Sequence, residues 1–134
     1  MNNSFDIKSV MLDKDKTPIL LSNANFKDVI DKMNEFKLGI VCIINDNSKL
    51  IGILTDGDIR RRLIKSQKPI SALFLDEAKK YCVKDPQTIK PKMKLVDAVK
   101  LMGKKQIWDL PVTDSNNKLI GLLHLHAAIS KLLK

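Results

Sequence analysis

The sequence is poor in aromatic residues and in cysteine. Aromatic side chains make up 4% of the 134 residues, so a buried core must be built from Ile, Leu, Val and Met. Cys42 and Cys82 lie far apart and form no CxxC pair, which argues against a disulfide framework or a zinc site. No apolar stretch reaches the length of a transmembrane helix, and the first ten residues contain no run typical of a signal peptide. We therefore expect a reduced, soluble, cytoplasmic protein with no membrane partner.

Positive charge, by contrast, is abundant. The 24 Lys and Arg residues exceed the 15 Asp and Glu residues and give a formal net charge of +9, which favours anionic partners such as nucleotides or sugar phosphates. The lysines are scattered along the chain, and no recognition helix, zinc finger or interleaving of basic and aromatic residues is present. We expect a solvated lysine-rich surface and no nucleic-acid partner.

An internal repeat organises the chain. A shift of 69 positions (118 minus 49) places "KLIGIL" at 49–54 on "KLIGLL" at 118–123, and "FKDVIDKM" at 26–33 on "LVDAVKLM" at 95–102. The alignment runs without a gap from about residue 17 to the C-terminus. Such a repeat indicates two copies of one supersecondary unit. We expect two domains, residues 1–68 and residues 69–134, the second including the linker.

Each copy has the pattern of a β-α-β-β-α unit, because short apolar runs alternate with stretches of helical periodicity. The predicted strands are 18–21, 39–44 and 49–54, then 88–90, 109–113 and 118–123. The predicted helices are 25–37, one that begins at Thr55, 94–105 and 124–133, with a short helix in the linker 66–82. The expected fold class is α+β, a sandwich-like arrangement in which the tandem copies would pack with pseudo-twofold symmetry and share clefts.

The turn "TDGD" at 55–58 has two interpretations. Thr55 and Asp58 have the spacing of a capping box, which would stabilise the start of a helix without any ligand. The same helix start can bind a phosphate, the carboxylate of Asp58 can accept from the two hydroxyls of a ribose, and Gly57 allows a close approach to the backbone. Arg60 and Arg61, one turn later, can pair with phosphate. Together these groups match the needs of a nucleotide.

Several segments resemble the cystathionine-β-synthase (CBS) domain, and the whole chain resembles one CBS pair, or Bateman module. The resemblance is strongest to the C-terminal CBS pair of the arabinose-5-phosphate isomerase family, and "TDGDIRR" also occurs in CBS pairs fused to sugar-nucleotide transferases. The segments that carry it are "VMLDKDKTPIL" (10–20), "LGIVCIIND" (38–46), "GILTDGDIRR" (52–61), "DPQTIKP" (85–91), "DLPVTD" (109–114) and "LIGLLHLH" (119–126).

The resemblance implies an adenosine nucleotide (AMP, ADP or ATP) in the cleft between the copies, with no other cofactor required. Thr55 would contact its phosphate, Asp58 its ribose, and Ile53 would line the pocket, with Arg60 and Arg61 as further phosphate partners. The base would lie against the second copy, at Thr88, Ile107, Trp108 and Asp109. Trp108 has an alternative role as a cap of the core or part of a dimer interface.

The second cleft departs from the family pattern. His124 replaces the threonine, and Ala127 stands where the aspartate is expected, so the ribose grip is missing. Ile40, which would line this cleft, is interpreted as a core residue. His124 and His126 lack a third ligand, so no metal site is predicted. We expect this degenerate cleft to be empty or weak.

The sequence favours a regulatory binding module of an arabinose-5-phosphate isomerase, whose sugar isomerase (SIS) domain would be a separate domain. The family implies a homodimer formed through the CBS modules. One alternative is the CBS pair of a sugar-nucleotide transferase, and another is a dimerisation module without a ligand. An enzyme is the third alternative, but no P-loop, nucleophile elbow, catalytic triad or metal triad is present, and Asp58 and His124 fall in different copies.

Overall fold

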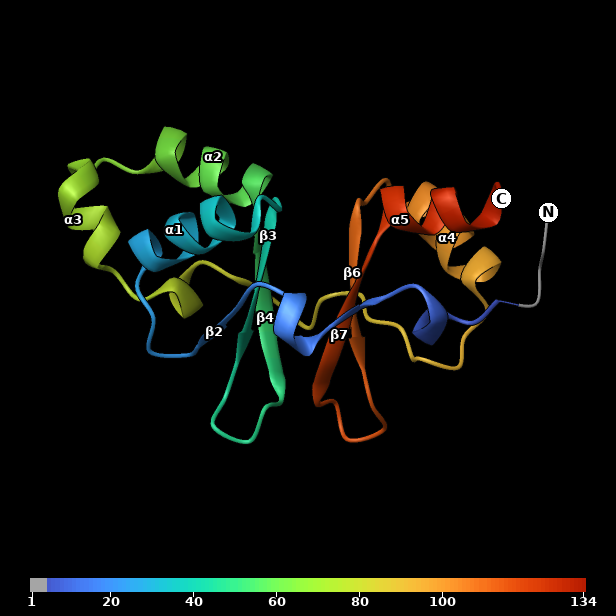
Figure 1. Cartoon of the computed structure of the whole chain (residues 1–134). Helices are drawn as coiled ribbons and strands as arrows, with labels where there is room; N and C mark the ends of the chain where they lie inside the picture. The colour runs from blue at the N-terminus through green and yellow to red at the C-terminus, as the bar shows by residue number, and fades with distance from the viewer. Residues whose placement is uncertain (1–4) are drawn as a thin grey trace. The chain divides into compact units, whose positions relative to one another are not determined.

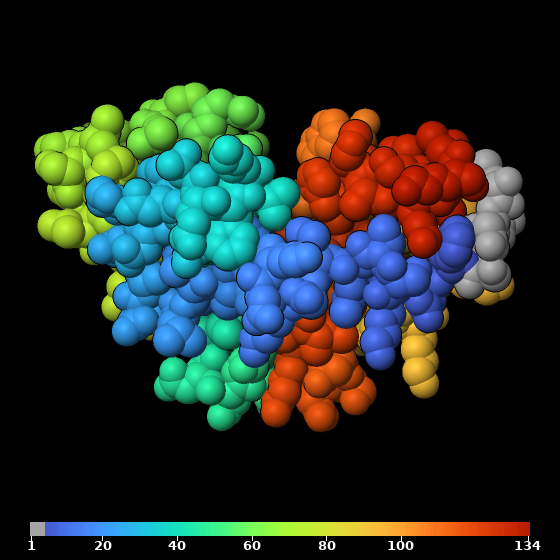
Figure 2. Space-filling view, in the orientation of Figure 1, coloured from blue at the N-terminus to red at the C-terminus, as the bar shows by residue number. Residues whose placement is uncertain are grey.

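The computed structural model describes residues 5–134, which divide into two compact units (Figure 1). The first unit comprises residues 18–86, and the second unit comprises residues 5–17 together with 87–134. The side chains of the N-terminal segment accordingly lie beside those of the C-terminal residues in the space-filling view (Figure 2). The expected domains follow the two sequence copies. In the compact units, residues 5–17, which precede the first copy, belong to the second unit, and residues 69–86, which fall in the second expected domain, belong to the first unit.

The first unit contains a four-stranded sheet in the order β2-β3-β4-β5, in which only the β2–β3 pair is parallel. Its strands are β2 (Ile19–Leu21), β3 (Ile40–Ile44), β4 (Leu50–Thr55) and β5 (Val83–Lys84). Its helices are α1 (Phe26–Phe36), α2 (Asp56–Lys65), α3 (Ile70–Leu75) and the 3-10 helix η3 (Ala78–Lys80).

The second unit repeats this arrangement with a three-stranded antiparallel sheet in the order β1-β7-β6. Its strands are β1 (Leu12–Asp13), β6 (Asp109–Thr113) and β7 (Leu119–His124). Its helices are α4 (Leu95–Lys105), α5 (Leu125–Leu132) and the 3-10 helices η1 (Ile7–Ser9) and η2 (Lys14–Lys16). The tandem α+β fold predicted from the repeat is therefore present, and the predicted helices and strands, except the strand at 88–90, lie within a few residues of their expected bounds.

Each unit has an aliphatic core between its sheet and its long helix. In the first unit Val29 and Met33 of α1 pack against strand residues such as Leu54. In the second, the equivalent positions Ala98 and Met102 of α4 are buried in the corresponding cluster. The helical spacing read from the sequence thus selects the buried faces correctly.

The edge strands β1 and β5 explain the exchange of leading segments. β1 precedes the first copy but pairs with β7, and β5 precedes the second copy but pairs with β4. Each edge strand passes close to a glycine of the repeated "KLIG". A Cβ atom at Gly121 would lie 2.3 Å from the carbonyl oxygen of Leu12, and one at Gly52 would lie 2.6 Å from that of Val83. These two positions therefore have no room for a side chain.

The predicted strand at 88–90 is wrong as an extended strand. Only one parallel bridge forms there, between Ile89 and Val112, through hydrogen bonds from Ile89 N to Pro111 O (3.1 Å) and from Thr113 N to Ile89 O (3.0 Å). Pro91 follows directly, and its missing N–H prevents the next bond of a parallel ladder.

The linker 66–82 contains the predicted short helix, α3, and is stabilised by polar contacts among its own side chains. Lys68 Nζ lies 2.7 Å from Asp76 Oδ2, and the Tyr81 hydroxyl donates to the same carboxylate. These two hydrogen bonds, that of Lys68 first, lower the pKa of Asp76. Arg62 of α2 lies 4.4 Å from the centre of the Tyr81 ring, which holds the linker against that helix.

Candidate functional site

The "TDGD" turn forms the start of α2 directly after β4. Thr55 is the N-cap, in extended conformation, and its Oγ1 accepts from the backbone N–H of Asp58 at 3.3 Å. Asp58 Oδ2 in turn accepts from the backbone N–H of Thr55 at 2.9 Å and from its hydroxyl at 3.0 Å. The capping box predicted as one interpretation of this turn is thus confirmed.

The second oxygen of Asp58 faces an arginine. Arg61 Nη2 donates to Asp58 Oδ1 at 2.9 Å, with side-chain exposures of 55% for Arg61 and 15% for Asp58. The carboxylate is therefore mostly covered and held from both sides, while the guanidinium remains largely in solvent. Thr55, Asp58 and Arg61 form one hydrogen-bonded group that we call the TDR cluster.

Three other predicted residues of the first unit lie near this helix start but do not join the cluster. Ile53 is half-buried on β4, and Ile40 is fully buried on β3, where its Cα is paired with that of Thr55. Ile40 is thus the core residue that the sequence predicted. Arg60 is exposed on α2, and its side chain makes no hydrogen bond or ion pair within residues 5–134.

The equivalent helix start in the second unit is built differently. His124 is the N-cap of α5, yet its side chain makes no capping bond. Its Nδ1 instead lies 2.8 Å from Oδ1 of Asp109 on β6, the residue opposite it across the β6–β7 pair. The Asp109 side chain is 9% exposed and that of His124 is 30% exposed. Asp109, predicted to face the nucleotide base, is thus engaged with His124.

The remaining predicted residues also belong to the second unit. Ala127 is half-buried on α5, and Thr88 and Ile107 are half-buried in loops before β6. Trp108 is 70% exposed, so the alternative role as a cap of its own unit's core is wrong. Joint recognition of one ligand by these residues and the TDR cluster remains a prediction, because they belong to different compact units.

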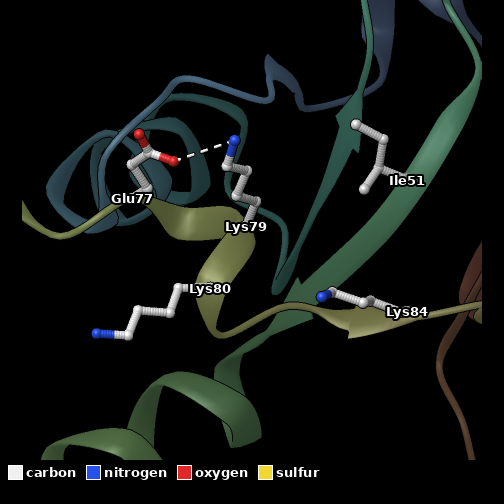
Figure 3. Close-up of a pocket in the computed structure, with 5 residues that line it drawn as sticks. All are labelled: Ile51, Glu77, Lys79, Lys80 and Lys84. Carbon is white, nitrogen blue, oxygen red and sulfur yellow. Dashed lines mark ion pairs between the residues drawn. The ribbon is translucent and has the colours of Figure 1, made fainter.

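A separate hollow of about 460 Å³ opens on the first unit, lined by Ile51, Glu77, Lys79, Lys80 and Lys84 (Figure 3). Lys79 Nζ lies 3.2 Å from Glu77 Oε2, and this ion pair neutralises part of the positive charge that lines the hollow. Ile51 precedes Thr55 by four residues on β4, about 13 Å along a strand at roughly 3.3 Å per residue. The hollow is therefore distinct from the TDR cluster.

Neither the thiols nor the histidines assemble a reactive or metal-binding group. Neither Cys42 nor Cys82 forms a disulfide, and burial raises the pKa of the Cys82 thiol, which keeps it protonated and weakly nucleophilic. No three His, Cys, Asp or Glu side chains gather at metal-binding distance in the described part of the chain. Across residues 5–134 every helix is too short or too polar to cross a membrane.

Comparison with known families gives a match to the CBS domain over residues 7–65 and again over residues 78–134. An uncharacterised protein of Helicobacter pylori is 34% identical over 92% of the chain and 36% of its own length. The "Probable arabinose 5-phosphate isomerase" of Haemophilus influenzae is 34% identical over 81% of the chain and 31% of its own length. The chain thus spans about a third of the length of the curated relatives it matches.

Among solved structures, the protein CBSX2 in complex with AMP superposes with a TM-score of 0.85. The match covers 96% of both chains, at 23% sequence identity, and shows that the fold is the same. The resemblance to a CBS pair is confirmed, and relatives that carry the arabinose-5-phosphate isomerase name are found as expected.

Proposed function

Because the chain belongs to the CBS-domain family and carries two copies of that domain, we propose that it is a regulatory module that binds an adenosine nucleotide of the AMP, ADP or ATP class. A CBS pair is regulatory and has no catalytic function by itself. The ligand alters the behaviour of the protein through its different affinity for alternative conformations of that protein.

The TDR cluster is the observation that carries the proposal. A covered carboxylate, a hydroxyl and a guanidinium meet at the first turn of α2, where the free backbone N–H groups of a helix favour an anion. In the proposed complex, Asp58 accepts from the ribose hydroxyls, while Thr55 and Arg61 face the phosphate. Arg60 is exposed one residue earlier and supplies a second cation, and Ile53 lines the apolar wall.

Residues of the second unit complete the proposed site by receiving the base. Trp108 offers an exposed aromatic face for stacking, and Thr88 and Ile107 offer backbone and apolar contacts. The AMP complex of CBSX2 supports the choice of an adenosine ligand, since that protein shares the fold. We propose that the second helix start, which carries His124 and Ala127, does not bind a ribose, because it has no carboxylate at the position of Asp58.

Calorimetry with AMP, ADP, ATP and a cytidine sugar nucleotide tests the proposal directly. We expect heat and a thermal shift with an adenosine nucleotide, equivalent to about 2.7 kcal/mol of stabilisation at a hundredfold excess over the dissociation constant. Asp58→Ala should abolish most of this response. Binding of the cytidine compound alone would favour a module from a sugar-nucleotide transferase, and no response to any compound would favour a dimerisation module.

A matched control separates ribose recognition from helix capping. Asp28 forms the same reciprocal box at the start of α1, with bonds of 3.0 Å and 2.8 Å to the backbone and side chain of Asn25. Asp28→Ala and Asp58→Ala should each lower the free energy of unfolding by about 1 kcal/mol. Only Asp58→Ala should remove the nucleotide response. An equal loss of response in both variants would contradict the role given to Asp58.

We further propose that the module belongs to a cytoplasmic sugar-phosphate isomerase whose SIS domain supplies the catalysis, and that two modules associate as a homodimer. The arabinose-5-phosphate isomerase name of a longer relative, of which the match covers 31%, supports this assignment. The isolated chain should show no isomerase turnover. Sedimentation measures the dimer, and turnover of arabinose 5-phosphate by the full-length protein, with and without AMP, measures the regulation.

A further inference from the structure

Arg61 occupies a position that a ribose diol needs. A carboxylate offers about four lone-pair positions. On Asp58, Oδ2 already accepts from the backbone N–H and the hydroxyl of Thr55, and Oδ1 accepts from Arg61. One position is left, whereas the two hydroxyls of a ribose require two acceptor positions. As long as the Thr55 hydroxyl stays on Oδ2, full recognition of the diol therefore requires Arg61 to leave Asp58.

The exposures identify Arg61 as the partner that moves. Asp58 is 15% exposed and is fixed by the capping box, while Arg61 is 55% exposed and is held to it by one ion pair. The guanidinium lies back over the first turn of α2, since a Cβ atom at Gly57 would meet both Nη atoms of Arg61 at 3.0 Å. An ion pair whose cation lies largely in solvent is weak and easily exchanged.

We propose that Arg61 is a latch that makes the phosphate a condition for full ribose recognition. This inference rests on the proposed nucleotide function of the TDR cluster. Without a phosphate, Arg61 stays on Asp58 and competes with the diol. A nucleotide phosphate at the start of α2 draws the guanidinium away through a charge-assisted, two-pronged contact and frees Oδ1. The cluster thereby discriminates nucleotides from nucleosides beyond the direct attraction of phosphate.

The test compares adenosine with AMP on the wild-type chain and on Arg61→Ala. A residue that only contacts phosphate would weaken AMP binding and leave adenosine unchanged. The latch predicts that adenosine binds more tightly to the variant, by about two- to fivefold, the factor set by loss of one exposed ion pair. AMP should bind about tenfold or more weakly, because a charge-assisted contact to phosphate is lost.

Two further variants separate the latch from the loss of the side-chain stem and from the change in net charge. Arg61→Met keeps most of the side-chain stem over Gly57, has no donor for Asp58, and should give the same gain in adenosine affinity. Lys65→Ala removes one charge from an exposed position near the end of the same helix and should change neither affinity by more than the general effect of net charge. Calorimetry gives both dissociation constants, and circular dichroism verifies that each variant is folded.

The outcomes separate the two proposals. If wild type binds AMP but Arg61→Ala binds adenosine no better than wild type, the latch is wrong and the nucleotide site stands. If wild type binds neither compound and Arg61→Ala binds neither, both proposals fail. Tighter adenosine binding by both Arg61 variants, and not by Lys65→Ala, supports the latch.

Discussion

Thr55 and His124 occupy the same step of the repeat, at the end of an inner strand and the start of a helix, but their side chains turn to different partners. Thr55 closes a capping box with Asp58 within its own helix. His124 makes no cap and pairs with Asp109 across the β6–β7 hairpin at 2.8 Å. The position of Asp58 is held by Ala127 in the second unit, and that of Asp109 is held by Ile40 in the first.

The backbone frame is nevertheless shared. Asp56 N donates to Gly39 O at 3.0 Å in the first unit, and Leu125 N donates to Trp108 O at 2.8 Å in the second. The helix starts are thus positioned by main-chain bonds that do not depend on the side chains beside them. This independence explains how one copy can keep a turn suited to ribose and phosphate while the other replaces it by a histidine–aspartate pair.

The largest effect on stability is expected at the glycines that both units share. Gly121→Ala and Gly52→Ala would each force a Cβ atom into an edge-strand carbonyl, at 2.3 Å and 2.6 Å. We expect losses of about 1–3 kcal/mol, somewhat greater for Gly121→Ala because the clash is closer. Urea denaturation followed by circular dichroism measures the change.

Gly103 is the control for these substitutions, since a Cβ atom there would meet nothing within 4 Å. Gly103→Ala, inside α4, should stabilise the protein by about 0.5–1 kcal/mol through helix propensity. Stability unchanged by Gly52→Ala and Gly121→Ala would mean that the edge strands are readily displaced.

The two helix starts should respond unequally to truncation. His124→Ala deprives the nearly buried Asp109 of its imidazole partner and should cost about 1–3 kcal/mol. Thr55→Ala removes one capping interaction and should cost about 0.5–2 kcal/mol. Denaturation of both variants and of His124→Ala/Asp109→Ala measures the coupling. If the free energy of unfolding lost in the double variant equals or exceeds the sum of the losses in the two single variants, the His124–Asp109 pair is not favourable.

Much of the fold follows from the repeat, because a gapless shift aligns whole strands and helices and local periodicity selects their buried faces. The edge strands could not be predicted. β1 and β5 are two residues long, and they pair with segments remote in sequence, so neither leaves a periodic signal. The paired glycines at 52 and 121 were the available signal, since both occur in an otherwise apolar strand.

The site was partly readable. The spacing of Thr55 and Asp58 predicted both the capping box and the ribose interpretation, and only coordinates could reveal that Arg61 occupies Asp58 Oδ1. The His124–Asp109 pair was missed because Asp109 was interpreted through the family resemblance. The register of the hairpin could have revealed the pair. Asp109 and His124 occupy the repeat positions of Ile40 and Thr55, which lie opposite each other in the first unit.

A graft of one helix start onto the other should sharpen the comparison. The triple variant Asp109→Ile, His124→Thr, Ala127→Asp copies the side chains of positions 40, 55 and 58 into the second unit. Because the backbone frame is shared, we expect a second capping box worth about 1 kcal/mol relative to the double variant Asp109→Ile, His124→Thr. Denaturation of the two variants measures the difference, and no gain would show that the frames differ more than their main-chain bonds suggest.

The smallest expected effect concerns the turns between β3 and β4 in the first unit and between β6 and β7 in the second. Asp114 Oδ1 accepts from the backbone N–H groups of Asn116 and Lys118, and Asn45 makes the same two bonds in the first unit, to Asn47 and Lys49. The bond from Lys118, and then that from Asn116, lowers the pKa of Asp114 below the ordinary value.

Since the pKa of Asp114 is lower in the folded state, its charge stabilises the protein fully above the unfolded pKa of about 3.9, and this contribution disappears as the pH falls through the folded pKa. The free energy of unfolding of wild type relative to Asp114→Asn should therefore decrease from pH 6 to pH 2.5. Asn45→Asp should introduce the same dependence in the first unit, because the turn and its two donors are already in place. Urea denaturation of the three proteins across this pH range measures both trends. A constant difference between wild type and Asp114→Asn would mean that the carboxylate and the amide serve the turn equally at every pH.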